Sequence, residues 1–502
     1  MGDYIVAVDI GTTHCRSVVY RLDGCVMARS EESYRTDHSI PGAAVQDADE
    51  VCSAAHRTVR EAIEASGLPK SCITAVVLCS VFHSLIGVDG GDAPVTPLVT
   101  WADSRSIEYS EALARVVDGP SIRARTGCSI HPMYFPARLA WLREEMPDVW
   151  ARVRRFVSIK EYVLRRWTGE YVVDLSVASG TGLLNNETME WDDDLLSLLG
   201  VTRGMFSALV EPTHVISSIR PEIRRELGLA ESAVIVTGAA DGALAHLATV
   251  GAGKEGVSLT VGTGAAIRRA TDRPAVSRHG ETWCYYLADG CWLHGVLVQD
   301  AGGVFNWLVS EFYSGEIAAD TARDLNPYHT VNEIMRETPP GANGLYFLPF
   351  LGGERSPNLN PRLRGAMFGM TFSTRRSDLV RALVEGISYR LRSAYECLVE
   401  DGENMRIVVT GGFTSSAEWV QTTSDFFGRK MLGSSQPDGS AWGAALIGMV
   451  ATGLISDIAD VDRHIRLSDV YLPRKDYYEK YQEMLPVYDS LYNSLVQTQN
   501  MI

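Results

Sequence analysis

The sequence has little of what marks a secreted or a membrane-spanning protein. Its nine cysteines are odd in number, scattered, and never arranged as Cys-x-x-Cys, which disfavours both a disulfide framework and a zinc site. No apolar run reaches the roughly 18 residues that cross a bilayer. The first residues, Met1 to Asp9, lack the cationic flank and long apolar stretch of a signal peptide. We therefore expect a protein of a reducing compartment, the cytoplasm.

Positive charge is also in short supply. Lys and Arg number 46 against 62 Asp and Glu, which gives a net charge of −16. An affinity for nucleic acid or for an acidic membrane surface is therefore not expected. If the substrates are anionic, the overall field opposes them, and local amide dipoles, a metal and a few placed cations must bind them. The sequence should thus contain anion-binding loops.

Two nucleotide-binding motifs are missing. There is no G-x-x-x-x-G-K-[ST] sequence and no G-x-G-x-x-G after the first strand, so P-loop and Rossmann folds are disfavoured. What the chain does have is length and apolar material, with 502 residues of which 46% are hydrophobic and 22% charged. These values are typical of a globular protein with two large lobes or three smaller domains.

Two segments of the chain share one local pattern. Near the start, an apolar strand at 5–8 runs into Asp9-Ile10-Gly11-Thr12-Thr13, and a second strand at 17–21 turns at Asp23-Gly24 into a third at 25–28. Far along the chain, the segment 257–267 again runs from a strand through Gly262-Thr263-Gly264 into another strand. The repeat predicts two lobes of related architecture, with a boundary near Gly251 to Gly256.

Strand and helix signals alternate between these corners, so the predicted fold class is α/β. The sequence predicts helices at 48–65, 136–145, 243–250 and 377–398, and strands at 73–79, 233–237 and 407–409. We expect Gly439 to Ala445 to form a loop that leads into a tightly packed helix, and 468–502 to form a helical packing tail. The predicted lobes are residues 1–252 and 253–502.

The first corner has the chemistry of a phosphate and metal site. Asp9 supplies a carboxylate at a strand end, Gly11 allows close backbone approach, and Thr12 and Thr13 add hydroxyls and amides. This combination suits a hydrated Mg²⁺ and nucleotide phosphates. A simple hairpin corner is the alternative. The second corner, Gly262 to Gly264, favours the phosphate interpretation, because two facing corners can hold a polyphosphate from both sides.

Asp241 follows a predicted strand and lies at the expected first turn of a helix, between Ala240 and Gly242. Little bulk obstructs it, so it is placed as a general base for phosphoryl transfer, which needs one carboxylate to accept the proton of the acceptor hydroxyl. The alternative is an Asp that caps the helix N-terminus, a common arrangement.

A second group of polar residues suits a polyol. His83 and the run Trp101-Ala102-Asp103-Ser104-Arg105 each follow a strand-like segment. Asp and Arg can bond adjacent hydroxyls, while Trp offers an apolar face. A surface Asp103–Arg105 pair beside a packed Trp101 is the alternative. Gly411-Gly412 permits close approach of a flat ligand such as adenine, or is only a turn.

Taken together, these residues resemble the FGGY family of carbohydrate kinases, whose fold is two actin-like (ribonuclease H-like) lobes around a central cleft that binds ATP and a sugar. The resemblance covers the chain from Asp9 to about Gly448. Besides the corners already described, its landmarks are Gly238 to Gly242, Gly352-Gly353-Glu354-Arg355-Ser356-Pro357 and Gly365 to Glu385.

The resemblance implies a role for each matching residue. Asp241 would be the catalytic base and Asp9 would help to hold Mg²⁺. The residues implied to bind ATP are Gly11, Thr12, Thr13, Arg16, Gly262, Thr263, Gly264, Gly302, Gly411 and Gly412. Those implied to line the sugar site are Phe82, His83, Trp101, Asp103 and Arg105. A homodimer is the oligomeric state that the resemblance suggests.

Within the family, the stretches 82–89, 100–105, 159–162 and 171–183 are most similar to gluconate kinases. This similarity implies phosphorylation of a terminal hydroxyl on an open-chain sugar or sugar acid, D-gluconate first, with Arg105 as the cation for its carboxylate. Xylulose kinases share the positions of His83, Asp103 and Asp241, so D-xylulose is the alternative acceptor. A non-catalytic actin-like nucleotide switch is a hypothesis from another class.

Three departures from the family pattern bear on these roles. Phe82 stands where xylulose kinases usually have Met, Gly264 where Ser is frequent, and Arg138 where Lys is usual. The first affects acceptor choice and the second phosphate contacts. Transfer to a sugar must also exclude water, so we expect the lobes to close, with Gly251, Gly253 and Gly256 as hinge points.

Overall fold

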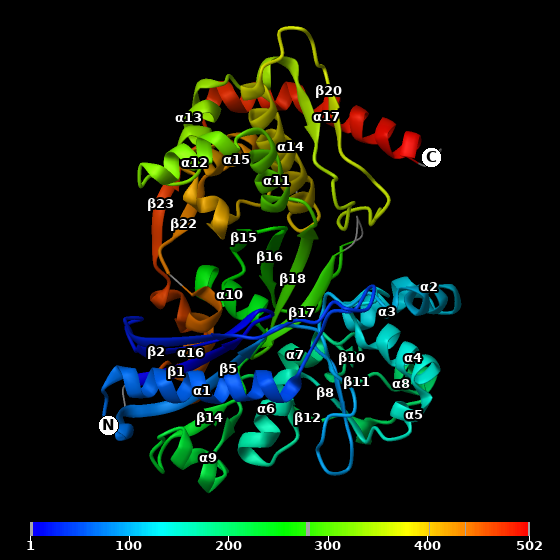
Figure 1. Cartoon of the computed structure of the whole chain (residues 1–502), viewed down its shortest axis with the longest axis vertical. Helices are drawn as coiled ribbons and strands as arrows, with labels where there is room; N and C mark the ends of the chain where they lie inside the picture. Colours follow the sequence, from blue (N-terminus) through cyan, green and yellow to red (C-terminus); the bar gives the residue numbers. More distant parts are fainter. Residues whose placement is uncertain (1–3, 278–281, 401, 437, 500–502) are drawn as a thin grey trace.

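The computed structural model describes residues 4–277, 282–400, 402–436 and 438–499, and these residues form two large mixed sheets with helices around them (Figure 1). The first sheet has the strand order β13 (Val215–Ile216), β14 (Val234–Val236), β5 (Ile73–Ser80), β1 (Tyr4–Ile10), β2 (His14–Arg21), β3 (Val26–Ser33). The second has the order β17 (Trp283–Ala288), β18 (Cys291–Val298), β16 (Ala265–Thr271), β15 (Gly256–Val261), β21 (Arg406–Thr410), β22 (Met431–Ser434), β23 (Leu467–Tyr471).

The two sheets repeat one arrangement. In the first, β1 is antiparallel to β2, which is antiparallel to β3, while β5 and β14 continue the sheet parallel to β1. In the second, β15, β16 and β18 form the antiparallel part, and β21 and β22 continue it parallel to β15. The predicted α/β fold of two related lobes is confirmed.

The local sequence explains these elements. β1 and β5 are buried along nearly their whole length, as their continuous apolar runs require. Exposure alternates along β3, which lies at the edge. The predicted turn at Asp23-Gly24 joins β2 to β3, and Gly24 adopts a φ of +85° there. Helix α1 (Ala48–Ser66) starts at Asp47, whose carboxylate accepts bonds from two backbone amides.

Smaller elements surround the sheets. The short strand β4 (Val45–Gln46) precedes α1 and pairs with β7 (Leu98–Val99). Besides β7, the chain between β5 and β14 contains α2 (Ile107–Val116), α3 (Gly119–Thr126), α4 (Phe135–Glu145), α5 (Pro147–Trp150), α6 (Ile159–Thr168), α7 (Leu175–Ser179), α8 (Asp193–Leu199), α9 (Pro221–Glu226) and the strand pairs β6 (Ile86–Val88)/β8 (Arg155–Val157), β9 (Val172–Asp174)/β12 (Ala208–Val210) and β10 (Leu184–Asn185)/β11 (Glu190–Trp191). The second half adds α11 (Gly302–Phe312), α12 (Ser314–Ala322), α13 (His329–Glu337), α14 (Arg376–Glu396), α15 (Ala417–Phe427) and the pair β19 (Tyr346–Leu348)/β20 (Ala366–Phe368).

The two halves share a hydrophobic core through two helices. α10 (Asp241–Val250) packs against α16 (Gly439–Ala451), and α16 also covers β1 and β5 of the first sheet. The contact is close: a Cβ at Gly443 would lie 2.1 Å from the carbonyl oxygen of Leu244. The loop expected at Gly439 to Ala445 is instead the first part of α16, because its small residues serve helix packing. The predicted boundary near residue 252 stays a prediction.

The segment around the predicted hinge is tightly packed. Gly251 has a φ of +90°, and a Cβ there would lie 1.7 Å from Oδ1 of Asp462. The same oxygen accepts a bond from the backbone N–H of Ala252, at 3.2 Å. The hinge role of this segment also stays a prediction.

The end of the chain forms an edge strand and a long helix. β23 pairs with β22, although we expected a helical tail from residue 468, and α17 (Lys475–Gln499) then runs beside α15 (Figure 1). Buried Tyr481 of α17 donates to Glu385 of α14 at 3.0 Å. In the ranges that the structure describes, no helix combines the length and apolar character needed to span a membrane.

Candidate active site

Two carboxylates lie where the parallel strands of the first sheet end. Asp9, near the end of β1, lies opposite Cys79 of β5, whose thiol donates to Oδ1 of Asp9 at 3.2 Å. Asp241 begins α10 directly after β14, the other neighbour of β5. Because these strands are parallel, their carboxyl ends bring the two carboxylates to one edge of the sheet, the usual place for a ligand site.

The environment of Asp241 suits a proton acceptor. Burial and the nearby charge of Asp9 raise the pKa of Asp241 to about 6. The group is therefore ionised at neutral pH yet more basic than an ordinary Asp. Its Oδ1 accepts a bond from the backbone N–H of Gly242 at 2.6 Å, while Ala240 occupies the N-cap position. Asp241 thus contacts the helix start but is not its capping residue.

Two cations close to Asp241 were not found from the sequence. A Cβ on Gly242 would lie 3.3 Å from Nη2 of Arg268, which β16 contributes from the second half. Lys160 of α6 forms a buried ion pair with Asp174, 2.6 Å between Nζ and Oδ2. Both positive charges lower the pKa of Asp241. The sequence feature that could have indicated Arg268 is the pair of charged residues Arg268-Arg269 inside an otherwise largely apolar strand.

The second corner collects several predicted nucleotide residues. Gly262 donates to the carbonyl of Gly264 at 2.8 Å and accepts from the N–H of Gly302 at 2.9 Å. A Cβ on Gly302 would lie 2.3 Å from that carbonyl oxygen of Gly262, and a Cβ on Gly411 would lie 2.3 Å from the carbonyl of Val261. Gly302 is also the first residue of α11, so a helix N-terminus faces this corner. Such an arrangement suits an anion. Gly412 and Thr263 are exposed there.

The first corner is tied to the predicted sugar residues. Gly11 donates to the carbonyl of His14 at 3.0 Å, which closes the turn. Oγ1 of Thr12 accepts a bond from the exposed indole N–H of Trp101 at 3.0 Å. Arg16 is held between Glu31, at 2.6 Å, and Asp438 at the start of α16. Its guanidinium therefore already has two carboxylate partners, and its role toward a nucleotide stays a prediction.

His83 has a defined protonation state. Its Nδ1 lies 2.5 Å from the carbonyl oxygen of Gly180, and because a carbonyl can only accept, Nδ1 carries the hydrogen. Burial lowers the pKa of His83 to about 3, so the ring is neutral and Nε2 is free to accept. The rings of Phe82, Tyr134 and Tyr285 surround it, and the two tyrosine hydroxyls lie 2.7 Å apart.

Asp103 and Arg105 mainly bind each other. Asp103 is buried and accepts from the N–H of Ala44 and from Nε of Arg105, each at 3.0 Å. The guanidinium carbon of Arg105 lies 4.4 Å from the ring centre of Trp141. The positive charge of Arg105 is thus neutralised by its partner. Its assignment to an acceptor carboxylate stays a prediction that this pairing does not favour.

Arg138, one of the departures from the family pattern, joins the two predicted sugar-binding loops. Its buried guanidinium donates to the backbone carbonyls of His83 and of Thr100, the latter at 2.5 Å. It also donates to Pro132 at 3.1 Å. Burial lowers the pKa of Arg138 to about 9. A buried cation here orients the backbone on both sides of the site.

The site fits a metal that is brought by a nucleotide. Among the described residues, no cluster of three or more His, Cys, Asp and Glu side chains could hold a metal ion. Asp9 and Asp241, however, present carboxylate oxygens at one place, and burial raises the pKa of each. Mg²⁺ keeps several waters and is commonly held by one or two carboxylates and substrate phosphates. The donor set therefore fits Mg²⁺.

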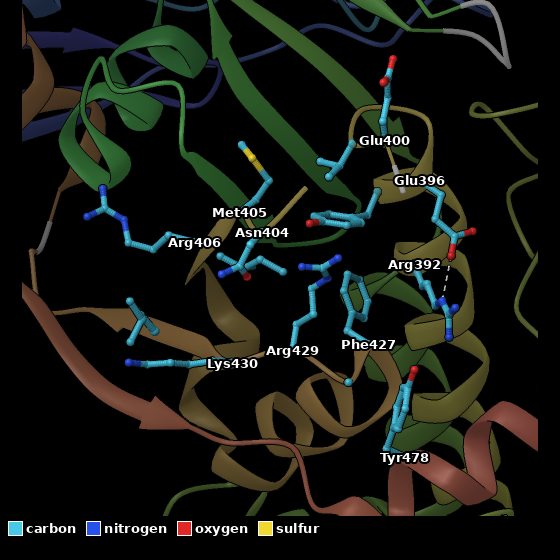
Figure 2. Close-up of a pocket in the computed structure, with 15 residues that line it drawn as sticks. Arg392, Glu396, Glu400, Asn404, Met405, Arg406, Phe427, Arg429, Lys430 and Tyr478 are labelled. Atoms are coloured by element: carbon cyan, nitrogen blue, oxygen red, sulfur yellow. Dashed lines mark hydrogen bonds and ion pairs between the residues drawn. The ribbon is translucent and has the colours of Figure 1, made fainter. Parts of the chain in front are cut away.

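A separate cavity lies on the second sheet (Figure 2). Arg406 begins β21, and Arg392, Arg429, Lys430 and Tyr478 lie around the same cavity. Gly411 follows the other end of β21. The cavity is therefore at the edge of the sheet opposite the glycine corner, and its residues are distinct from the candidate active site.

Comparisons with known proteins all identify similarity to carbohydrate kinases. Sequence profiles of the N-terminal and C-terminal domains of the FGGY family of carbohydrate kinases match residues 4–248 and 257–452. A gluconokinase of Bacillus subtilis (strain 168) is 33% identical over 493 residues, which cover 98% of this chain and 96% of the relative. Crystal structures of a gluconate kinase and of a ligand-bound xylulose kinase, both from Lactobacillus acidophilus, each show a TM-score of 0.92, 29% identity and coverage of 99% of both chains.

Proposed function

The chain belongs to the FGGY family of carbohydrate kinases and is a sugar kinase; from this premise we propose that it transfers the terminal phosphoryl group of ATP to the terminal hydroxyl of D-gluconate, giving 6-phospho-D-gluconate. The similarity to a gluconokinase along almost the whole chain supports this acceptor. The observation that carries the chemistry is Asp241, a carboxylate whose pKa is raised by burial and by the nearby charge of Asp9.

The proposed step is a direct displacement. The terminal oxygen of the acceptor forms a bond to the γ-phosphorus as the bond to the β-phosphate oxygen breaks, and ADP leaves. Asp241 accepts the proton of the attacking hydroxyl. When bound, Mg²⁺ supplies positive charge at the phosphate oxygens, and Asp9 is the residue that would hold it. Arg268 lies beside Asp241 and helps to keep it ionised.

The remaining residues bind the two substrates. The amides of Gly262, Thr263 and Gly264 and the N-terminus of α11 at Gly302 would hold phosphates from one side. The first corner would hold them from the other side through Gly11, Thr12 and Thr13, with Arg16 beside it. Gly411 and Gly412 would line the adenosine.

On the acceptor side, Nε2 of His83 would accept a bond from a sugar hydroxyl. Phe82 and Trp101 would cover the carbon chain of the acceptor, and Asp103 with Arg105 would line the rest of the acceptor site. Residues 1–252 would thus carry the acceptor site and 253–502 the nucleotide site. Closure of these lobes would exclude water during transfer.

A second acceptor, D-xylulose, is supported by one observation. The solved xylulose kinase from Lactobacillus acidophilus is as similar to this chain as the gluconate kinase from the same organism. Both proposals share the base and the nucleotide site. A non-catalytic switch loses its support, because the chain belongs to a family of kinases.

ADP formation with Mg·ATP against D-gluconate, D-xylulose, L-ribulose, glycerol and no sugar tests the proposal. We expect strong turnover with D-gluconate and only background without an acceptor. Preference for D-xylulose would reject gluconate as acceptor but keep the base and the nucleotide site. ATP hydrolysis that no acceptor stimulates would reject the kinase reaction itself.

A further inference from the structure

We propose that Arg355 binds the carboxylate of a sugar-acid acceptor and thereby selects acids over neutral sugars; this inference rests on the proposed function and names the residue that recognises the far end of the substrate. Arg355 belongs to the landmark Gly352-Gly353-Glu354-Arg355-Ser356-Pro357, for which the sequence suggested no role. It lies in the second half of the chain, whereas the predicted acceptor residues lie in the first.

The residues on either side of Arg355 are firmly held. Glu354 is buried, forms an ion pair with Arg390 of α14, and accepts a bond at 2.5 Å from the hydroxyl of Tyr492 of α17. Arg390 also donates to the backbone carbonyl of Ser356 at 2.8 Å. These bonds fix the backbone before and after Arg355, so its side chain projects from a rigid support.

Arg355 itself has no anionic partner. Its Nη2 donates to the sulfur of Met133 at 3.0 Å, and a thioether is a weak acceptor. Within the part of the chain that the structure describes, no carboxylate is found at ion-pair distance from it. Arg105, in contrast, already has Asp103 at 2.8 Å. A half-buried guanidinium without a counter-ion, in a chain of net charge −16, is a site built for an anion from outside.

Arg355 lines two cavities. One also contains Asp300 and the Glu354–Arg390 ion pair, whereas the other, on the side of Met133, contains no further charge in the described part of the chain. The second, the Arg355 cavity, is lined from the first half by Ser129, His131, Met133 and Tyr134, and from the second by Thr282, Trp283, Leu297, Arg355, Ser356 and Leu359. Among these described residues, Arg355 is the only one with a charge at neutral pH, since burial lowers the pKa of His131 to about 3. Polar and aromatic groups beside one cation suit the acidic end of a polyol.

A series of neighbouring rings links the surroundings of Asp241 to the cavity beside Arg355. Next to Asp241, a Cβ on Gly242 would lie 3.5 Å from the ring of Phe82. The ring of Phe82 lies 5.2 Å from that of His83, which lies 5.1 Å from that of Tyr134, a residue of the Arg355 cavity.

A continuous row of rings therefore leads from the base to the cation. D-Gluconate has its reacting hydroxyl at one end and its carboxylate at the other, with hydroxyl-bearing carbons between them. We place the reacting hydroxyl at Asp241 and the carboxylate at Arg355, with the carbon chain of the acceptor along these rings. Arg268 is not an equivalent candidate, because it lies beside the base, at the reacting end of the substrate.

Binding measurements separate this inference from the proposed reaction. We would measure the affinity of D-gluconate and of D-glucitol, its neutral counterpart, by calorimetry in the presence of Mg²⁺ and a nonhydrolysable ATP analogue. The proteins are the wild type, Arg355→Met, Arg355→Lys and, as a matched control, Arg429→Met. Arg429 also lacks an ion pair among the described residues, but it lines the cavity at the opposite edge of the sheet.

We expect Arg355→Met to lower the affinity for D-gluconate roughly 10- to 100-fold, the range for a hydrogen bond to a charged group. The affinity for D-glucitol should stay unchanged. Arg355→Lys should recover part of the loss, and Arg429→Met should bind both ligands like the wild type. Equal weakening of both ligands, or D-gluconate binding that survives in Arg355→Met, overturns the inference. So does a wild type that binds neither D-gluconate nor another aldonate such as D-xylonate.

Turnover decides the proposed function independently. If D-gluconate binds through Arg355 but yields no ADP, the anion site stands and gluconate as the reacting acceptor is rejected. If D-gluconate reacts but Arg355→Met does not change its affinity, the proposed function stands and the carboxylate is bound elsewhere, with Arg105→Met as the next variant.

Discussion

The two glycine corners occupy equivalent positions in the two sheets but carry different chemistry. The corner after β1 includes Asp9 and lies beside Asp241 and the Arg16–Asp438 pair. The corner after β15 contains glycine and threonine, and Gly302 and Gly411 approach it through contacts that leave no room for a Cβ. The two corners thus share the turn, but the first presents charged side chains and the second presents exposed backbone groups.

This division has a practical meaning. At the first corner, a substitution that changes charge while preserving shape should disturb chemistry more than folding. At the second, a substitution that adds a single carbon should disturb geometry and nucleotide binding more than the proton transfer. The expected effects below follow from this contrast.

The largest effect is expected at the base. Asp241→Asn should reduce turnover by roughly 100- to 10,000-fold, the range for loss of a general base. Its melting temperature at pH 8 should equal or exceed that of the wild type. The reason is that the pKa of Asp241 is raised in the folded state, so the ionised carboxylate destabilises the fold at any pH above its ordinary pKa.

Exposed Asp272, in a surface ion pair with Lys254, provides the control. Asp272→Asn should leave turnover unchanged. Steady-state kinetics and thermal unfolding of both variants check the expectation, and near-normal turnover in Asp241→Asn would remove Asp241 from the mechanism.

At the second corner, Gly302→Ala should raise the KM for ATP roughly 10-fold or more, since overpacking costs about 1–3 kcal/mol. The added Cβ would lie 2.3 Å from the carbonyl of Gly262 and would displace the corner. Gly315→Ala, in α12, is the matched control because nothing lies within 4 Å of its Cβ position. If both variants keep the ATP affinity of the wild type, the corner does not hold phosphates.

The pH dependence of kcat/KM should show the charges around Asp241. Protonation removes the base, so activity should fall as the pH drops through about 6. Arg268→Met removes a positive charge that lowers the pKa of Asp241, and its acid limb should move to higher pH. Asp9→Asn removes a negative charge that raises this pKa, and its limb should move to lower pH.

These opposite shifts are the decisive feature. If the acid side of the kcat/KM profile shifts in the same direction in both variants, or does not shift in either, the titrating group is not Asp241. Residual activity of a few percent is sufficient, because only the position of the limb is compared.

The smallest effect is expected far from both corners. Tyr492→Phe removes one of the three side-chain groups that bond the carboxylate of Glu354, next to Arg355. The loss of one such hydrogen bond costs about 1 kcal/mol, so the KM for D-gluconate should rise a few-fold while that for ATP stays unchanged. An equal change in both constants would indicate a general loss of stability, which thermal unfolding would also detect.

Local chemistry in the sequence was enough to predict the corners and Asp241. In each case a strand end, a glycine and an oxygen-bearing side chain are neighbours in the chain, and the fold keeps them together. Arg268 and Arg355 were not predicted as site residues, because the contacts that reveal them are made between the two halves of the chain. Arg268 of β16 approaches Gly242 at the start of α10, and Arg355 lies beside Met133, which is 222 residues earlier in the chain. Arg105 shows the opposite problem, since spacing cannot reveal that its charge is neutralised by Asp103.

The prediction of a loop at Gly439 to Ala445 was wrong for a related reason. A run of glycine and alanine is typical of a loop in isolation, but here it allows two helix backbones to approach. Packing of this segment against α10 and against β1 and β5 favours the helix there.

The packing of α10 on α16 also determines how the molecule loses its structure. Its core includes Ile5 and Val77 of the first sheet together with Trp442 and Leu446 of the last third of the chain. Each half also has a hydrophobic cluster of its own, but separation of the halves would expose the apolar residues of this shared core. We expect denaturation in one cooperative transition, and each half expressed separately to be insoluble or partly unfolded. Two family domains are recognised in the sequence, but we expect them to unfold together because they share this core.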